Sequence, residues 1–334
     1  MATGLISKRN GTKTSSFGTN ARINHDSAKF YNTKLYEGII PIIDAEYKEN
    51  DFPYDLHNKV ILGNSEKMEL IPDNSVHLMI TSPPYNVSKD YDENLSLLEY
   101  LRLLKNVLSE TYRVLVNGGR ACINVANIGR KPYIPLSDHL SKIMRDIGFN
   151  MRGEVIWNKG AGAGVSMAWG SWQSASNPVL RDVHEYILIF SKGDYQRKQN
   201  GKENSITKEQ FMEWTKSIWT MNPESAKKVN HPAPFPEELP YRLIQLLSFK
   251  DDIVLDPFMG SGTTAIASIK SKRVFVGYEI NEDYKIISEK RINALMNQGT
   301  FNFLVNDSAI EYTVVKDQNK KRKNSTTKDL RQLK

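Results

Sequence analysis

Short apolar runs alternate with longer amphipathic stretches along most of the chain. Six runs have the length and composition of buried strands: 76–81, 121–125, 154–157, 186–190, 253–256 and 274–278. Five stretches have the spacing of helices: 95–116, 136–147, 237–248, 263–271 and 282–296. The first of these has apolar positions at Leu97, Leu98, Leu101, Leu104, Leu108, Tyr112 and Leu115. We expect Gly118 and Gly119 to end that helix. The alternation predicts an α/β fold, with a mostly parallel sheet and helices on both faces.

Three segments fall outside this alternation. Residues 1–35 are polar and rich in Gly, Ser and Thr, which is typical of a flexible arm. Residues 159–183 are rich in Gly, Ser, Ala and Trp, and residues 193–230 are mostly polar. The sequence shows no internal repeat. We therefore expect an ordered α/β core with irregular segments attached to it.

The composition is typical of a globular protein. Of the 334 residues, 40% are hydrophobic and 25% are charged. No apolar run approaches the roughly 18 residues of a membrane helix, and no secretory signal precedes residue 12. The single cysteine, Cys122, excludes a disulfide within the chain. We expect a cytoplasmic protein of a bacterium or archaeon, without contact to a membrane.

Positive charge is concentrated at the two ends. The net charge is +7; residues 316–334 carry +6 and residues 1–34 carry +5, which leaves −4 for the rest. Basic ends around a weakly acidic body suit contact with phosphate groups. A solubilising tail without a partner explains Lys320–Lys323 equally well.

A glycine-rich turn follows the apolar run 253–256. The segment continues through Gly260 and Gly262 into a helix, and glycine allows a backbone to turn tightly beside a ligand. The next apolar run ends in Glu279, where an acid holds ribose hydroxyls in nucleoside-binding folds. The pattern lacks the third glycine of a dinucleotide site and the Gly-Lys-Ser/Thr of a phosphate loop. A nucleoside without a polyphosphate therefore fits better than NAD or ATP.

The segment Asp256–Thr264 resembles the cofactor motif of amino-methyltransferases that act on DNA. The resemblance implies a Rossmann-like methyltransferase fold and S-adenosyl-L-methionine as cofactor. His231–Pro236 is similar to a further family element that borders the cofactor, so we expect a structural role for His231. The cofactor-binding residues that the resemblance implies are Asp256, Phe258, Gly260, Ser261, Gly262, Thr263, Glu279, Phe235, Pro234, Thr81 and Asn64.

A rigid turn follows the apolar run 76–81. Two prolines stop the strand and keep the following residues extended, at the sheet edge where ligands bind. The exocyclic amine of cytosine or adenine is a poor nucleophile, because its lone pair is delocalised into the ring. Hydrogen-bond acceptors such as the Ser82 hydroxyl and the Pro83 carbonyl would localise that lone pair. Tyr85 can stack on a base that has left the duplex.

We therefore predict Ser82, Pro83, Pro84 and Tyr85 as catalytic residues. The non-catalytic alternative for this segment is a proline-rich turn, or a Pro-Pro-x-Tyr ligand for another domain. A catalytically inert module with this fold, which binds nucleic acid or cofactor, is the alternative at the level of function.

The residue before the two prolines points to the target atom. Relatives that methylate adenine N6 usually have Asp or Asn there, and those that methylate cytosine N4 usually have Ser, as this chain does in Ser82. Methylation at C5 of cytosine needs a cysteine thiolate, and Cys122 lies in an apolar run, where it resembles a core residue. We predict cytosine N4 as the target; adenine N6, or methylation of RNA or of a protein amide nitrogen, is the alternative.

The catalytic turn precedes the cofactor turn, which is similar to the beta arrangement of this family, over residues 58–297. The implied organisation is a basic arm 1–35, a catalytic half 36–192, a target-recognition region 193–230, a cofactor-binding half 231–300 and a basic extension 301–334. This resembles restriction–modification enzymes. We expect double-stranded DNA as substrate, a cognate restriction endonuclease as functional partner, and a monomer or homodimer.

Residues that read DNA are expected in the irregular segments. The candidates are Trp169, Trp172, Gln173, Ser174, Asn177 and Arg181, although packing explains the tryptophans equally well. The six histidines show no ligand spacing, so we expect no metal site.

Overall fold

The computed structural model describes residues 33–37, 47–85, 95–129, 131–160, 170–224 and 235–302, with side chains as far as residue 297. The chain divides into two compact units, Met1–Arg291 and Ile292–Lys334, and the first contains the whole sheet. Strands are β1 Lys59–Leu62, β2 Val76–Thr81, β3 Leu115–Val125, β4 Ile128–Gly129, β5 Tyr133–Ile134, β6 Phe149–Asn158, β7 His184–Lys192, β8 Ile218–Thr220, β9 Ile253–Asp256 and β10 Val274–Glu279. Helices are α2 Leu97–Val114, α3 Leu136–Ile147, α4 Lys208–Trp214, α6 Glu238–Leu247, α7 Thr263–Lys270 and α8 Glu282–Asn302, with 3₁₀ turns at Lys34–Tyr36 and Tyr54–Leu56.

Within the described residues, eight strands form one sheet in the order β1-β10-β9-β2-β3-β7-β6-β8. Neighbours from β1 to β3 run parallel, as do β6 and β8. Strand β7 runs antiparallel to both β3 and β6. The prediction of a mostly parallel sheet is confirmed, and β7 adds one reversed strand that the sequence did not reveal.

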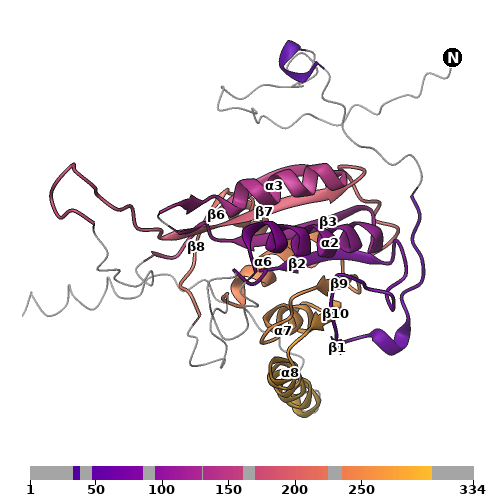
Figure 1. The fold of residues 1–334 in the computed structure, drawn as a ribbon. Coiled ribbons are helices and arrows are strands. Elements are labelled where there is room, and N and C mark those ends of the chain that lie inside the picture. Colours follow the sequence, from indigo (N-terminus) through magenta and orange to yellow (C-terminus); the bar gives the residue numbers. More distant parts are fainter. Residues whose placement is uncertain are drawn as a thin grey trace, which may run out of the picture. The chain divides into compact units, whose positions relative to one another are not determined.

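Helices cover both faces of this sheet, as predicted (Figure 1). Side chains of α2 and α3 share one core with Ile253 and Leu255, whereas α6 and α7 share the other with Val254. The alternation along β9 follows from the strand period of two, and it explains why such strands are apolar throughout.

The predicted strands and helices all occur; β2, β9 and α3 have the predicted bounds, and the ends of the others differ. The largest difference concerns the expected helix stop at Gly118 and Gly119, which is wrong. Helix α2 ends at Val114, and Leu115 already has the extended backbone of β3. Both glycines lie inside β3, and Gly118 has a φ of +75°. A Cβ on Gly118 would lie 2.7 Å from the Gln196 carbonyl oxygen, so glycine permits close approach of that segment.

Four short elements were not predicted: β1, β8, α4 and the β4–β5 hairpin. Strands β1 and β8 are the two edges of the sheet, and each has only three or four residues. A run of that length contains too few positions to show a period. Strand β8 and helix α4 lie within the region 193–230, whose expected role in target recognition stays a prediction.

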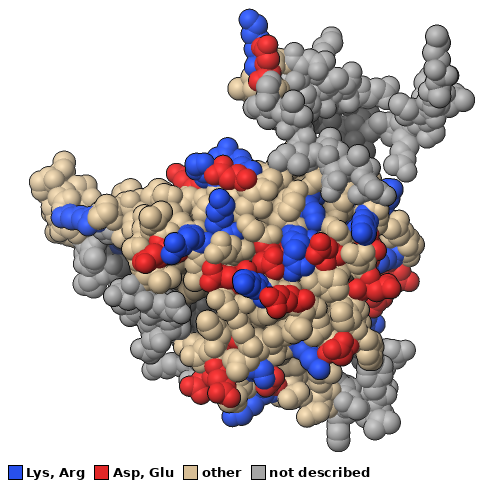
Figure 2. Space-filling view, turned by 45° about the vertical axis from the view of Figure 1, so that its right-hand side comes forward, with Lys and Arg blue, Asp and Glu red and all other residues tan. Residues whose placement is uncertain are grey.

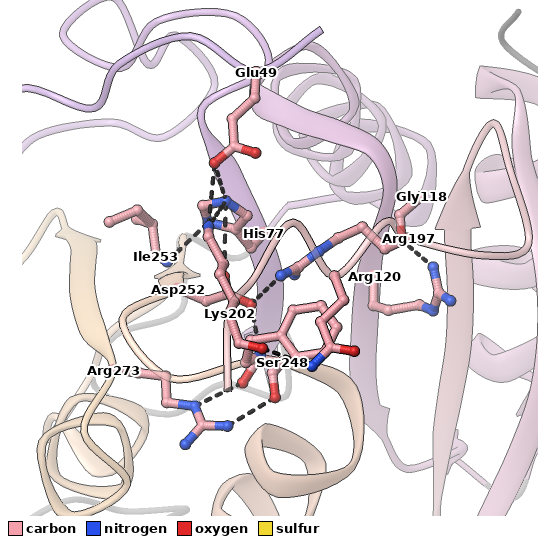
Figure 3. Close-up of polar contacts among 12 residues, drawn as sticks. Glu49, His77, Gly118, Arg120, Arg197, Lys202, Ser248, Asp252, Ile253 and Arg273 are labelled. Atoms are coloured by element: carbon pink, nitrogen blue, oxygen red, sulfur yellow. Dashed lines mark hydrogen bonds and ion pairs between the residues drawn. The ribbon is translucent and has the colours of Figure 1, made fainter. Parts of the chain in front are cut away.

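Charged side chains meet at the amino-terminal ends of the parallel strands (Figure 3). Ser82 lies at the opposite, carboxyl-terminal end of β2. The fully buried Asp252 has Oδ2 2.6 Å from Arg197 Nη2 and Oδ1 3.1 Å from Lys202 Nζ. The main-chain N–H of Phe249 also donates to this carboxylate at 2.7 Å. The segment with Arg197 and Lys202 is thereby fixed to the start of β9.

His77 joins this charged cluster through both of its ring nitrogens. Its Nδ1 accepts the Ile253 main-chain N–H at 2.9 Å, so the ring hydrogen is on Nε2 and faces Glu49 Oε1 at 2.8 Å. The hydrogen bond from His77, together with one from the Tyr47 hydroxyl, holds the pKa of Glu49 far below its usual range. The cluster connects residues 47–49 with β2 and β9.

Asp252→Ala should lower the free energy of unfolding by about 3–5 kcal/mol, because two cations would lose their buried counterion. Urea unfolding measures this change. Glu203→Ala is the control, since Glu203 pairs with Lys250 at the surface, where an ion pair contributes little. An equal decrease in the free energy of unfolding of the two variants would show that the buried Asp252 ion pairs stabilise the fold no more than a surface pair does.

Candidate active site

The sheet brings the two predicted motifs together at one edge. Strand β2 lies beside β9, and β9 lies beside β10, all parallel, so their carboxyl ends meet. The catalytic turn Ser82–Tyr85 follows β2, the glycine-rich turn follows β9, and Glu279 ends β10. Segments about 175 residues apart in sequence thus share one site.

Asp256 connects the catalytic strand to the glycine-rich turn. Its Oδ1 accepts the Thr81 hydroxyl at 2.7 Å and the Phe258 main-chain N–H at 3.1 Å. Its Oδ2 accepts the Thr264 hydroxyl at 2.6 Å. Burial raises the pKa of Asp256 to about 7, and these three hydrogen bonds oppose the shift. The carboxylate points inward, so its first role is to hold β2, β9 and α7 in register.

Glu279 holds the glycine-rich turn from the other side. Its Oε2 accepts the Gly260 main-chain N–H at 2.7 Å, and its Oε1 accepts that of Asn281 at 2.9 Å. Burial raises the pKa of Glu279, whereas these N–H donors lower it. A carboxylate has about four acceptor positions, so hydroxyl groups of a ligand can still bind.

Gly262 is the N-cap of α7 and has a φ of +81°. A Cβ at this position would approach Ser288 Cβ to 3.0 Å. The second glycine of the turn is therefore required by the backbone conformation and by contact with α8. The Ser261 carbonyl accepts a hydrogen bond from Arg291, which adds to the same contact.

The catalytic turn is anchored by its prolines and by Tyr100. Pro83 is buried, and the Tyr100 hydroxyl donates to the Pro84 carbonyl at 2.7 Å. Ser82 Oγ lies 3.3 Å from the Tyr85 hydroxyl oxygen. The Pro84 carbonyl is thus occupied by α2, which supports Pro83 as the main-chain acceptor of the turn.

A polar network beneath Tyr85 was not predicted. Glu185 Oε2 accepts the Tyr85 hydroxyl at 3.1 Å and Asn124 Nδ2 at 2.6 Å. Glu185 Oε1 lies 2.6 Å from Lys159 Nζ. Burial and the negative charge of Glu185 raise the pKa of Tyr85 well above its ordinary value. The signal in the sequence was the presence of Asn124 and Glu185 at the ends of otherwise apolar runs.

Three further predicted cofactor residues are described. Phe258 packs against the core beside α2, and Phe235 packs against the core beside α6. Asn64 caps a turn, since its Oδ1 accepts the Glu66 main-chain N–H at 2.9 Å and its Nδ2 donates to the Glu66 carboxylate at 3.0 Å. Contact of these residues with a cofactor stays a prediction. Pro234 and His231 lie outside the described residues.

The predicted DNA-reading residues lie on an excursion between β6 and β7, except Trp169, which is outside the described residues. Gly170 and Pro178 form an antiparallel bridge at its base. Inside it, the Ser171 hydroxyl donates to the Ser174 carbonyl at 2.8 Å and accepts the Asn177 main-chain N–H at 2.8 Å. Trp172 is 63% exposed, so it is not a core residue.

Cys122 is fully buried in the core between β3 and α6, as the sequence predicted. Burial raises the pKa of its thiol to about 12. A thiolate for attack on C5 of cytosine is therefore not accessible here.

Comparison with known proteins decides the family. Residues 76–290 match the N6/N4 family of DNA methylases. This chain belongs to that family. The type II methyltransferase M.MjaI from Methanocaldococcus jannaschii is 36% identical over 281 residues, which cover 71% of this chain and 91% of M.MjaI.

Solved structures agree with this assignment. TTHA0409 from Thermus thermophilus, described as a DNA modification methylase and solved with S-adenosyl-L-methionine, has a TM-score of 0.58 at 29% identity and covers 71% of this chain and 93% of its own. The cytosine-N4-specific PvuII DNA methyltransferase shares the fold, with a TM-score of 0.56 at 21% identity over 72% of this chain and 91% of its own.

This DNA methyltransferase therefore uses S-adenosyl-L-methionine, and DNA is its substrate. The described residues fit the cofactor. The Glu279 carboxylate at the end of β10 suits the ribose diol of the cofactor, and the glycine-rich turn, which has no side chain at Gly260 and Gly262, suits close approach of its methionine part. Among the described residues, no cluster of His, Cys, Asp or Glu is suited to a metal ion. No helix in the described ranges combines the length and hydropathy that a membrane crossing needs.

Glu279→Ala should weaken S-adenosylmethionine binding about 10–100-fold, because hydrogen bonds to a carboxylate contribute about 1.5–3 kcal/mol. Isothermal titration calorimetry measures the change. Glu282→Ala, at the exposed start of α8, is the matched control. Unchanged affinity in Glu279→Ala would remove this acid from the cofactor site.

The raised pKa of Asp256 predicts that the stability of the protein depends on pH. Its pKa is about 7 when folded and about 3.9 when unfolded, so protonation stabilises the folded chain. This contribution is complete below pH 4 and is lost as the pH rises through 7. Urea titrations of wild type and Asp256→Asn from pH 4 to 8 should show their stability difference falling by about 3–4 kcal/mol. A constant difference would contradict the raised pKa.

Proposed function

We propose that this enzyme methylates N4 of cytosine in double-stranded DNA. The observation that carries the proposal is Ser82, a neutral hydroxyl at the end of β2, in the place where adenine-specific relatives usually have Asp or Asn. The hydroxyl lies beside the anchored Pro83–Pro84 turn. Serine at this place is the residue that cytosine-N4-specific relatives usually have.

The turn supplies the acceptors that the reaction needs. Ser82 Oγ and the Pro83 carbonyl accept the two N–H groups of the amine, which localises its lone pair on nitrogen. Bound S-adenosylmethionine supplies an electrophilic methyl group on a sulfonium sulfur. The nitrogen lone pair would form the new N–C bond as the methyl–sulfur bond breaks and its electron pair stays on sulfur, and the positively charged nitrogen would then lose one proton to water. Asp256 and Glu279 keep the two turns in position throughout.

The target base must leave the duplex to reach this turn, which costs a few kcal/mol. We assign Trp172, Gln173, Ser174, Asn177 and Arg181 to DNA contact, because they lie on the exposed excursion before β7. Figure 2 shows Lys and Arg interspersed with Asp and Glu on the face in view. That mixture supports the charge count, which places the basic excess at the chain ends rather than on the body.

The relatives named type II methyltransferases suggest the biological role. We propose that methylation protects host DNA from a cognate restriction endonuclease, and that the enzyme acts as a monomer or homodimer. Restriction analysis of DNA from cells that express the enzyme tests protection, and analytical ultracentrifugation tests the assembly.

The methylated base is identified by treating unmethylated DNA with enzyme and isotope-labelled S-adenosylmethionine, digesting it to nucleosides and separating these by mass spectrometry. We expect the label in N4-methylcytosine. Label in N6-methyladenine would overturn the choice of base and keep the DNA methyltransferase. A Ser82→Ala reaction in parallel should lose at least 100-fold in kcat, since one of two amine acceptors is missing.

A further inference from the structure

The Glu185 carboxylate lies where four segments meet. It begins β7, and it faces the ends of β3 and β6 because β7 is antiparallel to both. Its exposed fraction is 7%. Three donors surround it, the Tyr85 hydroxyl, Asn124 Nδ2 and Lys159 Nζ, at 3.1, 2.6 and 2.6 Å. Lys159 supplies the positive charge that allows an ionised carboxylate to remain at this depth.

The carboxylate fixes the direction of the hydrogen bonds above it. An ionised carboxylate only accepts, so the single hydrogen of the Tyr85 hydroxyl points toward Glu185. Between Ser82 and Tyr85, at 3.3 Å, either oxygen is a geometrically possible donor. Because the Tyr85 hydrogen is already used, Ser82 must donate to Tyr85. The main-chain N–H of Ala126 bonds to the same phenol oxygen, which completes its set of partners.

This direction matters for Ser82. Its one hydrogen is directed at Tyr85, and Asn124 Nδ2 donates to Oγ over a long 3.5 Å, so one lone pair of Oγ remains for a donor outside the network. A hydroxyl with a free hydrogen offers a substrate amine both a donor and an acceptor. A hydroxyl held in this way offers an acceptor only, which is the role that localises the lone pair of an amine.

We propose that Glu185 is a positioning residue, which fixes the hydrogen-bond chain from Ser82 through Tyr85 to Glu185 and thereby makes Ser82 a pure acceptor for the substrate amine. The inference rests on the proposed role of Ser82 and not on which base is methylated. Asn124 belongs to the same arrangement: its Nδ2 faces the carboxylate, and its Oδ1 has no hydrogen-bond partner among the described residues.

The Glu185→Gln variant should reverse the direction of the hydrogen bonds between Ser82, Tyr85 and residue 185. The amide oxygen of the new side chain pairs with Lys159, so its NH₂ group faces Tyr85, and Asn124 can turn its unpartnered Oδ1 toward that group. Tyr85 then accepts this hydrogen bond and donates to Ser82, and the Ser82 hydrogen points at the substrate. We expect kcat to fall about 100-fold while the affinity for S-adenosylmethionine stays unchanged.

A double-mutant cycle distinguishes two roles of Glu185: fixing the direction of the hydrogen bonds at Ser82, and supporting the site structurally. Tyr85→Phe removes the link, so the Ser82 hydroxyl rotates freely and kcat falls about 10-fold. In that background, Glu185→Gln should have a much smaller further effect, because only the long 3.5 Å contact from Asn124 Nδ2 still connects Glu185 to Ser82. Effects that multiply would overturn the proposal, since a purely supporting Glu185 would act independently of Tyr85.

Two further variants keep the result interpretable. Lys159→Met leaves the carboxylate as an acceptor, so at pH 8 it should lose much less kcat than Glu185→Gln. An equal loss would mean that only the integrity of the network matters, and would overturn the proposal. Glu154→Gln, on the exposed part of β6, is the matched control for loss of one carboxylate. Thermal unfolding and cofactor titration of each variant exclude misfolding.

Failure of the proposed function has a different signature. If Ser82→Ala keeps wild-type kcat, the role of Ser82 itself is wrong. If Ser82→Ala is inactive and the cycle is multiplicative, the role of Ser82 stands and that of Glu185 falls. The identity of the methylated nucleoside affects neither outcome.

Discussion

The hydrogen bond between the Thr81 hydroxyl and the Asp256 carboxylate, 2.7 Å long and buried, is the contact on which the site depends. Thr81 is the last residue of the catalytic strand, and Asp256 is the last residue of the cofactor strand. The same carboxylate also binds the Thr264 hydroxyl in α7. One side chain thus aligns the Ser82–Tyr85 turn, to which we assign the substrate amine, with the glycine-rich turn, to which we assign the cofactor.

This contact explains why the order of the motifs along the chain has little effect on the chemistry. The two turns face each other because β2 and β9 are hydrogen-bonded neighbours in the sheet. They need no short connection, since the intervening residues return to the sheet through β3, β7 and β6. Parallel strands bring their carboxyl ends to one edge wherever the chain begins.

The sequence predicted this edge well, for physical reasons. Runs such as 253–256 are apolar throughout because strands covered on both faces are buried. Gly262 was recognisable because only glycine readily adopts its φ of +81° at the start of a helix. What the sequence could not reveal depends on tertiary contacts. The reversed direction of β7, the close approach at Gly118 and the convergence of Lys159 on Glu185 result from pairing between distant segments.

Three buried acids at one sheet edge would repel one another if all were bare anions, and the fold treats each of them differently. Asp256 has its pKa raised to about 7, so it carries only part of a charge near neutral pH. Glu279 is stabilised by main-chain N–H groups of the turn that it holds. Glu185 has a full counterion in Lys159. Asp256 and Glu279 are coupled, because the negative charge of Glu279 helps to raise the pKa of Asp256. The Glu185–Lys159 pair beneath the Ser82–Tyr85 turn is balanced by itself, so a change there need not disturb the two acids that hold the glycine-rich turn.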